Sequence, residues 1–323
     1  RRESIDEGSI RIFNLLEEVV IRRTRQFIRR AYPEATIRGK TITWPQRRLH
    51  TVEYDLEATY EGFYTQIVRR IESLNLAHYR LESYKKSGEE QDDFELGRQV
   101  ALVGIFKSRF LKRLESSIDA FRISIRRALE FVKTFAEYVQ DGVLIDSASF
   151  QTAMRLLDND DADSEGTAPR SRAMDIDDED EARAIIEQLP RLDTEKYDRR
   201  AIHRALQDDI DALTDIWHDI KDISVPDDAK IQRLKALLEG DLCGQKVIIF
   251  TYYKDTARYV YRALTGYDSA AWRDNVGSPN IRRIDSSVKT TDRTHLVEHF
   301  APVASGYPEL AGSEQEIDII VAT

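Results

Sequence analysis

The chain has 323 residues, of which 41% are hydrophobic and 33% charged, and its formal net charge is −10. This composition is typical of a soluble, helix-rich protein, and the length predicts two folded units with a sizeable core. No apolar run approaches the roughly 20 residues of a membrane-spanning helix, and no signal peptide is visible at Arg1. The single cysteine, Cys243, excludes internal disulfides and zinc clusters built on several thiolates, which suits a reducing cytoplasm.

Basic and acidic residues are segregated along the chain. Residues 22–48 hold nine basic residues and one acid, and residues 98–133 hold nine basic residues and three acids. Residues 158–181 hold eleven acids and two arginines. Because salt screens charges beyond about 8–10 Å, local charge rather than net charge decides binding. The two basic stretches are therefore either candidates for nucleic-acid contact or solvated helix faces.

The first part of the chain predicts helices around one short strand. Residues 5–32 carry apolar residues at helical spacing and predict an amphipathic helix. Residues 42–56 favour a strand, with Pro45 placing its start at a sheet edge. A second helix is predicted over residues 57–84, and a polar break follows at 87–93.

Residues 103–135 predict one long helix. Apolar residues recur three or four positions apart, with no proline or glycine after Gly104. Such a stripe spans about 40 residues at most, or ~50–60 Å at 1.5 Å per residue, and its aromatic members are interpreted as core. On a single helix, two basic clusters would lie ~21 Å apart on one face, where both could contact DNA. The clusters are Arg109, Lys112 and Arg113, and Arg122, Arg126 and Arg127.

An acidic segment and another helix follow. Residues 158–181 have almost no apolar content and predict a flexible loop. Residues 196–223 predict a helix with an Asp-rich outer face, which we expect to pack antiparallel on the long helix. Asp227 or Asp228 is expected to cap the next helix. The predicted apolar seam of 196–223 consists of Ile202, Leu206, Ile210, Leu213, Trp217 and Ile220.

The last eighty residues predict a strand, helix, strand, helix and strand. Residues 246–251 (KVIIFT) and 316–323 (EIDIIVAT) are short apolar runs rich in β-branched residues, typical of strands buried in a parallel sheet. We therefore expect residues 246–250, 281–284 and 317–322 to form one parallel sheet. Ligands of such sheets bind at the carboxyl ends of the strands.

Polar residues follow each of these strands. Hydroxyls and free backbone amides at strand-to-helix turns suit phosphate oxygens, because the N-terminus of the following helix adds partial positive charge. Alternatively, Thr251 only caps a helix that begins near Asp255. Asp255 and Asp285 are interpreted as cap or turn residues rather than as a catalytic pair. The candidate nucleic-acid contacts are Thr251, Tyr252, Ser286, Ser287, Lys289 and Thr323.

Residues 295–299 (HLVEH) match the H-x-x-E-H pattern of a zinc protease family. Two histidines four positions apart on a helix could bind zinc, with Glu298 as the base. No further histidine follows at a suitable place to supply a third ligand. We expect no metal site, with the histidines facing outward and three apolar side chains packing on the sheet: Leu296, Val297 and Phe300.

Blocks of the chain resemble, in order, the SWI/SNF-type ATPases of helicase superfamily two. The segments KVIIFTYYKDTARYVYRAL, RRIDSSVKTTDRTHLVEHFAP and EIDIIVAT are similar to the second RecA-like lobe, and residues 228–240 to the helix that leads into it. Residues 17–35 resemble the Arg-Arg-Thr segment after the first lobe, and residues 110–122 a helical segment of prokaryotic members. The resemblance covers roughly half of the chain.

This resemblance implies an α/β fold with a large α-helical insertion. Residues 1–56 would link the first and second lobes, residues 57–226 would form the insertion, and residues 227–323 would form part of a RecA-like parallel sheet. The implied function is that of a DNA-dependent ATPase motor, a helicase or translocase acting on double-stranded DNA in the cytoplasm. Its partners would be DNA, the first lobe of the same protein and proteins bound by the insertion, with no membrane.

The sequence lacks the motifs with which the resembling family binds and hydrolyses ATP. There is no Gly-rich loop ending in Gly-Lys-Ser/Thr, no Asp-Glu-x-His box and no arginine-finger motif, and the acidic run 177–183 lacks the context of such a box. ATP and Mg²⁺ would bind in the full-length protein, and this chain alone is expected to bind no cofactor. The alternative is a non-enzymatic helical scaffold with a degenerate RecA-like lobe, which recruits proteins through its acidic loop. Flanking sequence in the parent gene would distinguish the two.

Overall fold

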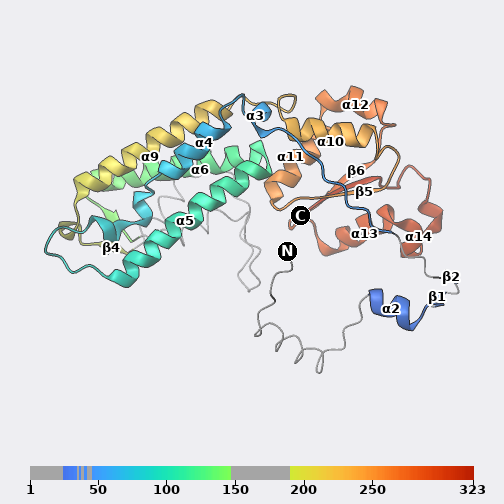
Figure 1. Ribbon diagram of the computed structural model, residues 1–323, viewed down its shortest axis with the longest axis horizontal. Helices are drawn as coiled ribbons and strands as arrows, with labels where there is room; N and C mark the ends of the chain where they lie inside the picture. Colours follow the sequence, from blue (N-terminus) through green and yellow to red (C-terminus); the bar gives the residue numbers. More distant parts are fainter. Residues whose placement is uncertain (1–24, 35, 38–39, 42–45, 147–189) are drawn as a thin grey trace, which may run out of the picture. The chain divides into compact units, whose positions relative to one another are not determined.

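The computed structural model describes residues 25–34, 36–37, 40–41, 46–146 and 190–323 (Figure 1). The chain divides into two compact units, Arg1–Glu53 and Tyr54–Thr323. The predictions for residues 5–24 and 158–181 lie outside the described residues. The predicted domain boundaries at 56 and 226 stay predictions.

In the first unit, one helix precedes a small hairpin. Helix α2 (Arg25–Ala31) is followed by β1 (Thr36–Ile37) and β2 (Lys40–Thr41), which pair antiparallel. The strand predicted over residues 42–56 is wrong where the structure describes it. Residues 46–55 form no strand, and α3 begins at Leu56.

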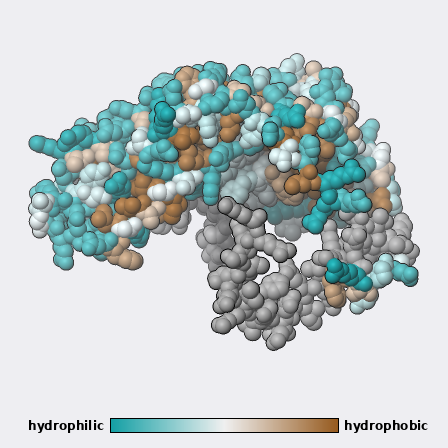
Figure 2. All heavy atoms as spheres, in the orientation of Figure 1, coloured by the Kyte–Doolittle hydropathy of each residue, from teal (hydrophilic) through white to brown (hydrophobic). Residues whose placement is uncertain are grey.

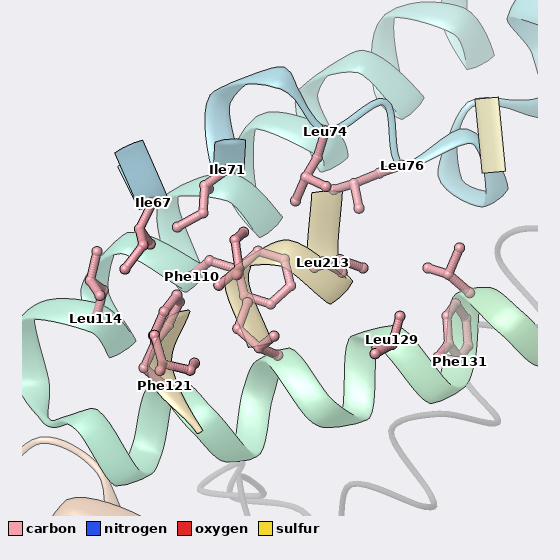
Figure 3. Packing of buried hydrophobic residues seen from close by; sticks show 14 of the residues in the cluster. Ile67, Ile71, Leu74, Leu76, Phe110, Leu114, Phe121, Leu129, Phe131 and Leu213 are labelled. Atoms are coloured by element: carbon pink, nitrogen blue, oxygen red, sulfur yellow. The ribbon is translucent and has the colours of Figure 1, made fainter. Parts of the chain in front are cut away.

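The helical part of the second unit is built around one apolar core (Figure 3). Its main helices are α3 (Leu56–Thr59), α4 (Tyr64–Ser73), α5 (Asp93–Ser116), α6 (Ile118–Gln140) and α9 (Arg199–Ile220). Short connections complete it: η1 (Ala77–Tyr79), η2 (Leu81–Tyr84), η3 (Thr194–Lys196) and the antiparallel pair β3 (Leu144–Ile145) and β4 (Arg191–Leu192). Fully buried side chains from α4, α5, α6 and α9 meet there, including Ile67, Leu114, Phe121 and Leu213.

The single long helix predicted over residues 103–135 is wrong. The chain leaves the helix at Ser117 (φ −162°, ψ 153°), whose hydroxyl accepts a hydrogen bond from Ala120 N at 3.2 Å and caps α6. Helices α5 and α6 pack on each other, and the apolar stripe continues through the break because both helices face one core. The basic clusters therefore do not share one helix face.

The six arginines and lysines of those clusters also differ in environment. Lys112 and Arg126 are exposed, whereas Arg113 is buried. Arg122 donates hydrogen bonds to the carbonyl oxygens of Ile220 (3.2 Å) and Ile223 (2.5 Å). Arg122 therefore has a structural contact and holds the end of α9 in place.

The helix predicted over residues 57–84 is also interrupted. Glu61, Gly62 and Leu76 have positive φ angles (51°, 83° and 47°), which end one helical segment and begin another. At the second break, the buried carboxylate of Asp209 on α9 accepts hydrogen bonds from Asn75 N at 2.5 Å and Ala77 N at 3.3 Å. A side chain more than a hundred residues away thus satisfies backbone groups that a continuous helix would have paired internally.

The expected antiparallel packing of residues 196–223 is confirmed. The start of α6 contacts the end of α9 through Arg122, and Arg199 at the start of α9 donates to Val139 O and Gln140 O at the end of α6. Of the predicted seam, Ile210 and Trp217 are only partly buried, and Ile216 is buried in addition. The fully buried seam residues are Ile202, Leu206, Leu213 and Ile220.

The α/β part contains the expected three-stranded parallel sheet. The strands are β5 (Val247–Phe250), β6 (Ile281–Ile284) and β7 (Ile319–Ala322), in the order β5-β7-β6. Val247 and Ile281 both lie opposite Ile319, so the strands are in register. The chain is thus mostly helical with a small parallel sheet. The remaining elements are α10 (Ala229–Glu239), α11 (Lys254–Thr265), η4 (Tyr267–Ser269), α12 (Ala270–Asn275), α13 (Thr290–Phe300), α14 (Pro302–Ser305) and η5 (Pro308–Leu310).

The cap predicted at Asp227 or Asp228 is present. Asp228 caps α10, because its carboxylate accepts hydrogen bonds from Lys230 N (2.9 Å) and Ile231 N (3.1 Å). On one face of the sheet, Ile317, Ile320 and Ala322 pack with side chains from β6 and α13. Ile248 and Phe250 of β5 are exposed, so the prediction that this strand is buried on both faces is wrong.

Exposed apolar side chains also gather along α5 (Figure 2). They are Phe94, Val100 and Ile105. Among the described helices, none combines the length and apolar character needed to cross a membrane.

Candidate nucleic-acid interface

The carboxyl ends of the three strands bring the predicted contact residues to one edge of the sheet. Thr251 N donates to Ala322 O at 2.8 Å, and Thr323 N donates to Ile284 O at 3.2 Å. The turn after β5, the end of β7 and the turn after β6 are therefore neighbours along this edge. Parallel pairing places all three there, as the sequence predicts.

In the turn after β5, Thr251 does not cap the following helix. Its hydroxyl donates to Tyr253 O at 3.1 Å and lies 3.4 Å from Ala322 O, and its side chain is half-buried. Helix α11 begins at Lys254 with Tyr253 at the cap position. The alternative that Thr251 only caps this helix is therefore wrong. Tyr252 is 84% exposed and points its ring away from the core.

The turn after β6 is organised by Asp285. Ser287 donates to Asp285 Oδ1 through both its backbone N–H, at 2.9 Å, and its hydroxyl. Burial raises the pKa of Asp285, but the Ser287 hydrogen bonds and the charge of Arg283, 2.9 Å away, outweigh burial and hold that pKa below its ordinary value. Asp285 is thus an ionised turn residue, as predicted. It leaves Ser286, Ser287 and Lys289 exposed at the edge.

Both helices that follow these turns have N-termini without a side-chain cap. Neither Tyr253 before α11 nor Lys289 before α13 has a side-chain capping hydrogen bond. The first N–H groups of a helix have no intrahelical acceptor and carry partial positive charge, which favours anions. Asp292 in the first turn of α13 is exposed and weakens this effect there, while Asp255 in the first turn of α11 is paired.

The partner of Asp255 is a correction to the sequence interpretation. Asp255 was expected to serve as a cap or turn residue. Instead its carboxylate pairs with the guanidinium of Arg113 at 2.7 Å, and both side chains are buried. The two residues lie 142 positions apart, so no local pattern could have indicated this contact.

No zinc site forms at residues 295–299. The rings of His295 and His299 stack with centroids 3.9 Å apart, and His299 Nδ1 lies 2.9 Å from His295 O. Within the described ranges, no three His, Cys, Asp or Glu side chains are grouped so that they could hold a metal ion. Leu296 and Phe300 pack on the sheet as expected, but Val297 is 51% exposed, contrary to expectation.

One Gly-Lys-Thr tripeptide matches the last three residues of a phosphate-binding loop. It occupies residues 39–41, and Glu34 stands where the first glycine of a phosphate-binding loop would be. In the structure Lys40 and Thr41 form β2, paired with β1, rather than the turn between a strand and a helix. The tripeptide therefore does not form a phosphate-binding loop of that kind.

Comparisons with known proteins add little to what the geometry shows about function. No family model matches the chain, and no curated protein matches it. Among solved structures, the C-terminal part of the Fun30 ATPase domain is similar, with 15% sequence identity and a TM-score of 0.30 over 86% of this chain and 69% of that chain. A likeness at this level does not assign a family.

Proposed function

We propose that this chain is part of a DNA-dependent ATPase motor, of the helicase or translocase type, and that it contacts the sugar–phosphate backbone through the carboxyl edge of its sheet. The observation that carries the proposal is that two helices without side-chain caps follow strands that end at one edge of the sheet. The ordered resemblance to SWI/SNF-type ATPases supports it, because the resemblance predicted the three parallel strands that form this edge.

Backbone amides and hydroxyl groups recognise phosphate oxygens regardless of the base, which suits a protein that moves along DNA. The exposed ammonium of Lys289 adds one positive charge at the same edge. Since the whole chain carries a net charge of −10, binding has to depend on such local groups.

In the intact motor, ATP and Mg²⁺ would be held by another lobe, because this sequence contains no complete phosphate-binding loop. Closing and opening of the two lobes would then shift the phosphate contacts along a strand. The share of this chain is contact with the DNA and transmission of the motion rather than hydrolysis.

The test is the double variant Thr251→Val/Lys289→Gln, measured by fluorescence anisotropy with a short labelled duplex over a range of salt. We expect weaker binding to every sequence tested. Loss of one lysine contact should reduce the salt slope by about 0.9, so the wild type should lose about 3.5-fold more affinity than the variant between 50 and 200 mM salt.

The matched comparison is Lys133→Gln/Thr134→Val, which makes the same two changes on α6, away from the sheet edge. We expect it to bind like the wild type. A folded Thr251→Val/Lys289→Gln variant with unchanged affinity and salt slope would contradict the proposal. A loss of DNA affinity seen only in the α6 variant would indicate that the DNA contact lies on the basic helical stretch.

A further inference from the structure

The junction between α5 and α6 contacts the start of α11, the helix that opens at the candidate interface. We call residues 113–119 the elbow. It belongs to the helical part, whereas α11 follows directly from the β5 turn. Polar contacts join them: Arg113 with Asp255 (2.7 Å), the hydroxyls of Ser116 and Ser117 with that of Thr256 (2.8 and 2.9 Å), and Asp119 with Arg262 (2.6 Å).

Arg113 contacts the β5 turn in two ways. It forms the buried ion pair with Asp255, and its guanidinium carbon lies 4.6 Å from the ring centroid of Tyr253. A planar guanidinium can lay its face on a ring and still direct its N–H groups at a carboxylate, and an ammonium lacks that planar face. Arg113 therefore holds two residues of the turn, on either side of Lys254.

Tyr253 in turn sets the conformation of the predicted contact residues. Its carbonyl oxygen accepts hydrogen bonds from the Thr251 hydroxyl at 3.1 Å and from Ala257 N at 3.0 Å. Its ring meets the exposed Tyr252 ring edge to face, with centroids 4.9 Å apart. A displacement of Tyr253 would change the direction of the Thr251 hydroxyl and the position of the Tyr252 ring.

We propose that Arg113 is a positioning residue, which holds the turn 251–255 in the conformation that presents Thr251 and Tyr252 at the sheet edge. The helical part thereby controls the phosphate contact, since a movement of the elbow moves the turn. The DNA consequence rests on the proposed function, whereas the effect on the turn itself does not.

A purely structural role of the ion pair between Arg113 and Asp255 predicts a different result. Removing it would loosen the second unit as a whole. A positioning residue instead loosens the turn and leaves the rest of the sheet unchanged. The two alternatives are therefore separated by where the backbone becomes mobile, and not by a change in overall stability.

The test uses hydrogen exchange of single amides in the full chain. Arg113→Lys keeps the positive charge beside Asp255 but removes the planar group that stacks on Tyr253. We expect the amides of Thr251 and Ala257, which donate to Ala322 O and Tyr253 O, to exchange about tenfold faster in this variant. The amide of Thr323, which donates to Ile284 O at the same edge, should be unchanged.

The matched control is Arg262→Met, which removes the exposed contact between α11 and the elbow far from the turn. We expect exchange at Thr251 and Ala257 to match the wild type in this control. Unchanged exchange at these amides in folded Arg113→Lys would overturn the proposal, and so would an equal increase at Thr323.

DNA binding supplies the second measurement. Arg113→Lys should weaken binding of the labelled duplex in the wild-type background and have a smaller effect in the Thr251→Val background, because both changes act on the Thr251 contact. Additive losses would overturn the control of phosphate contact by Arg113. If the wild-type chain does not bind DNA, the proposed function fails, while the exchange result still decides the role of Arg113 in the turn.

Discussion

Two buried groups in the helical core should give folding stability opposite dependences on pH. His78 packs against the Phe131 ring with centroids 4.8 Å apart, and its Nδ1 is buried without a hydrogen-bond partner among the described residues. Burial lowers the pKa of His78 from its ordinary value of 6.5 to about 3. Burial also raises the pKa of Asp209 from 3.8 to about 6, against the hydrogen bonds from Asn75 and Ala77.

The sign of each contribution to folding stability depends on whether the folded or the unfolded chain binds the proton more readily. The unfolded chain protonates His78 more readily, so its contribution to stability falls as the pH is lowered below 6.5, by about 2 kcal/mol between pH 7 and pH 5. The folded chain protonates Asp209 more readily, so its contribution to stability rises by about 1 kcal/mol as the pH is lowered over the same interval. The two contributions should therefore partly offset each other in the wild type.

Single substitutions should expose the two opposing contributions. His78→Leu leaves the Asp209 contribution, so this variant should gain about 1 kcal/mol of stability from pH 7 to pH 5. Asp209→Asn leaves the His78 contribution, so that variant should lose about 2 kcal/mol over the same interval. The assay is urea unfolding followed by circular dichroism at both pH values and constant ionic strength. The difference between pH values removes the cost of each substitution that does not depend on pH.

His50→Leu, at an exposed position in the first unit, is the control and should follow the wild type. The reasoning is refuted if His78→Leu shows the same pH dependence as the wild type. Such a result would mean that His78 titrates alike in the folded and unfolded chains, and that its burial does not affect its protonation.

Two further predictions concern a cap and the missing phosphate loop. Asp228 accepts hydrogen bonds from two N–H groups of α10 and from the buried Tyr259 hydroxyl at 2.9 Å, so Asp228→Ala should lower the free energy of unfolding in urea by about 3 kcal/mol. Asp228→Asn keeps an acceptor and should lose clearly less, and equal losses in the two variants would contradict the capping role. The purified chain should hydrolyse ATP no faster than a buffer control in a phosphate-release assay, because it lacks a phosphate-cradling loop; turnover that persists through repurification would show that another site holds the nucleotide.

Local sequence patterns were enough to predict the elements that are specified by residues only a few positions apart. The β-branched runs at 246–250 and 317–322 predicted strands of one parallel sheet, because such runs are typical of that setting. Burial on both faces holds for β7 but not for β5, whose Ile248 and Phe250 are exposed. The spacing of Ile202, Leu206 and Leu213 predicted a buried helix face, and Asp228 a helix cap. Parallel pairing then required the strand-end turns to lie at one edge, so that part of the candidate interface was predictable.

Tertiary contacts decided the rest. The apolar period runs through Ser117 without interruption, since α5 and α6 bury their stripes in the same core, and the spacing alone cannot indicate a break. The helix break at Leu76 is stabilised by Asp209, and the β5 turn by Arg113. In both cases the contacting charge comes from more than a hundred residues away, and only the folded chain brings it to its partner.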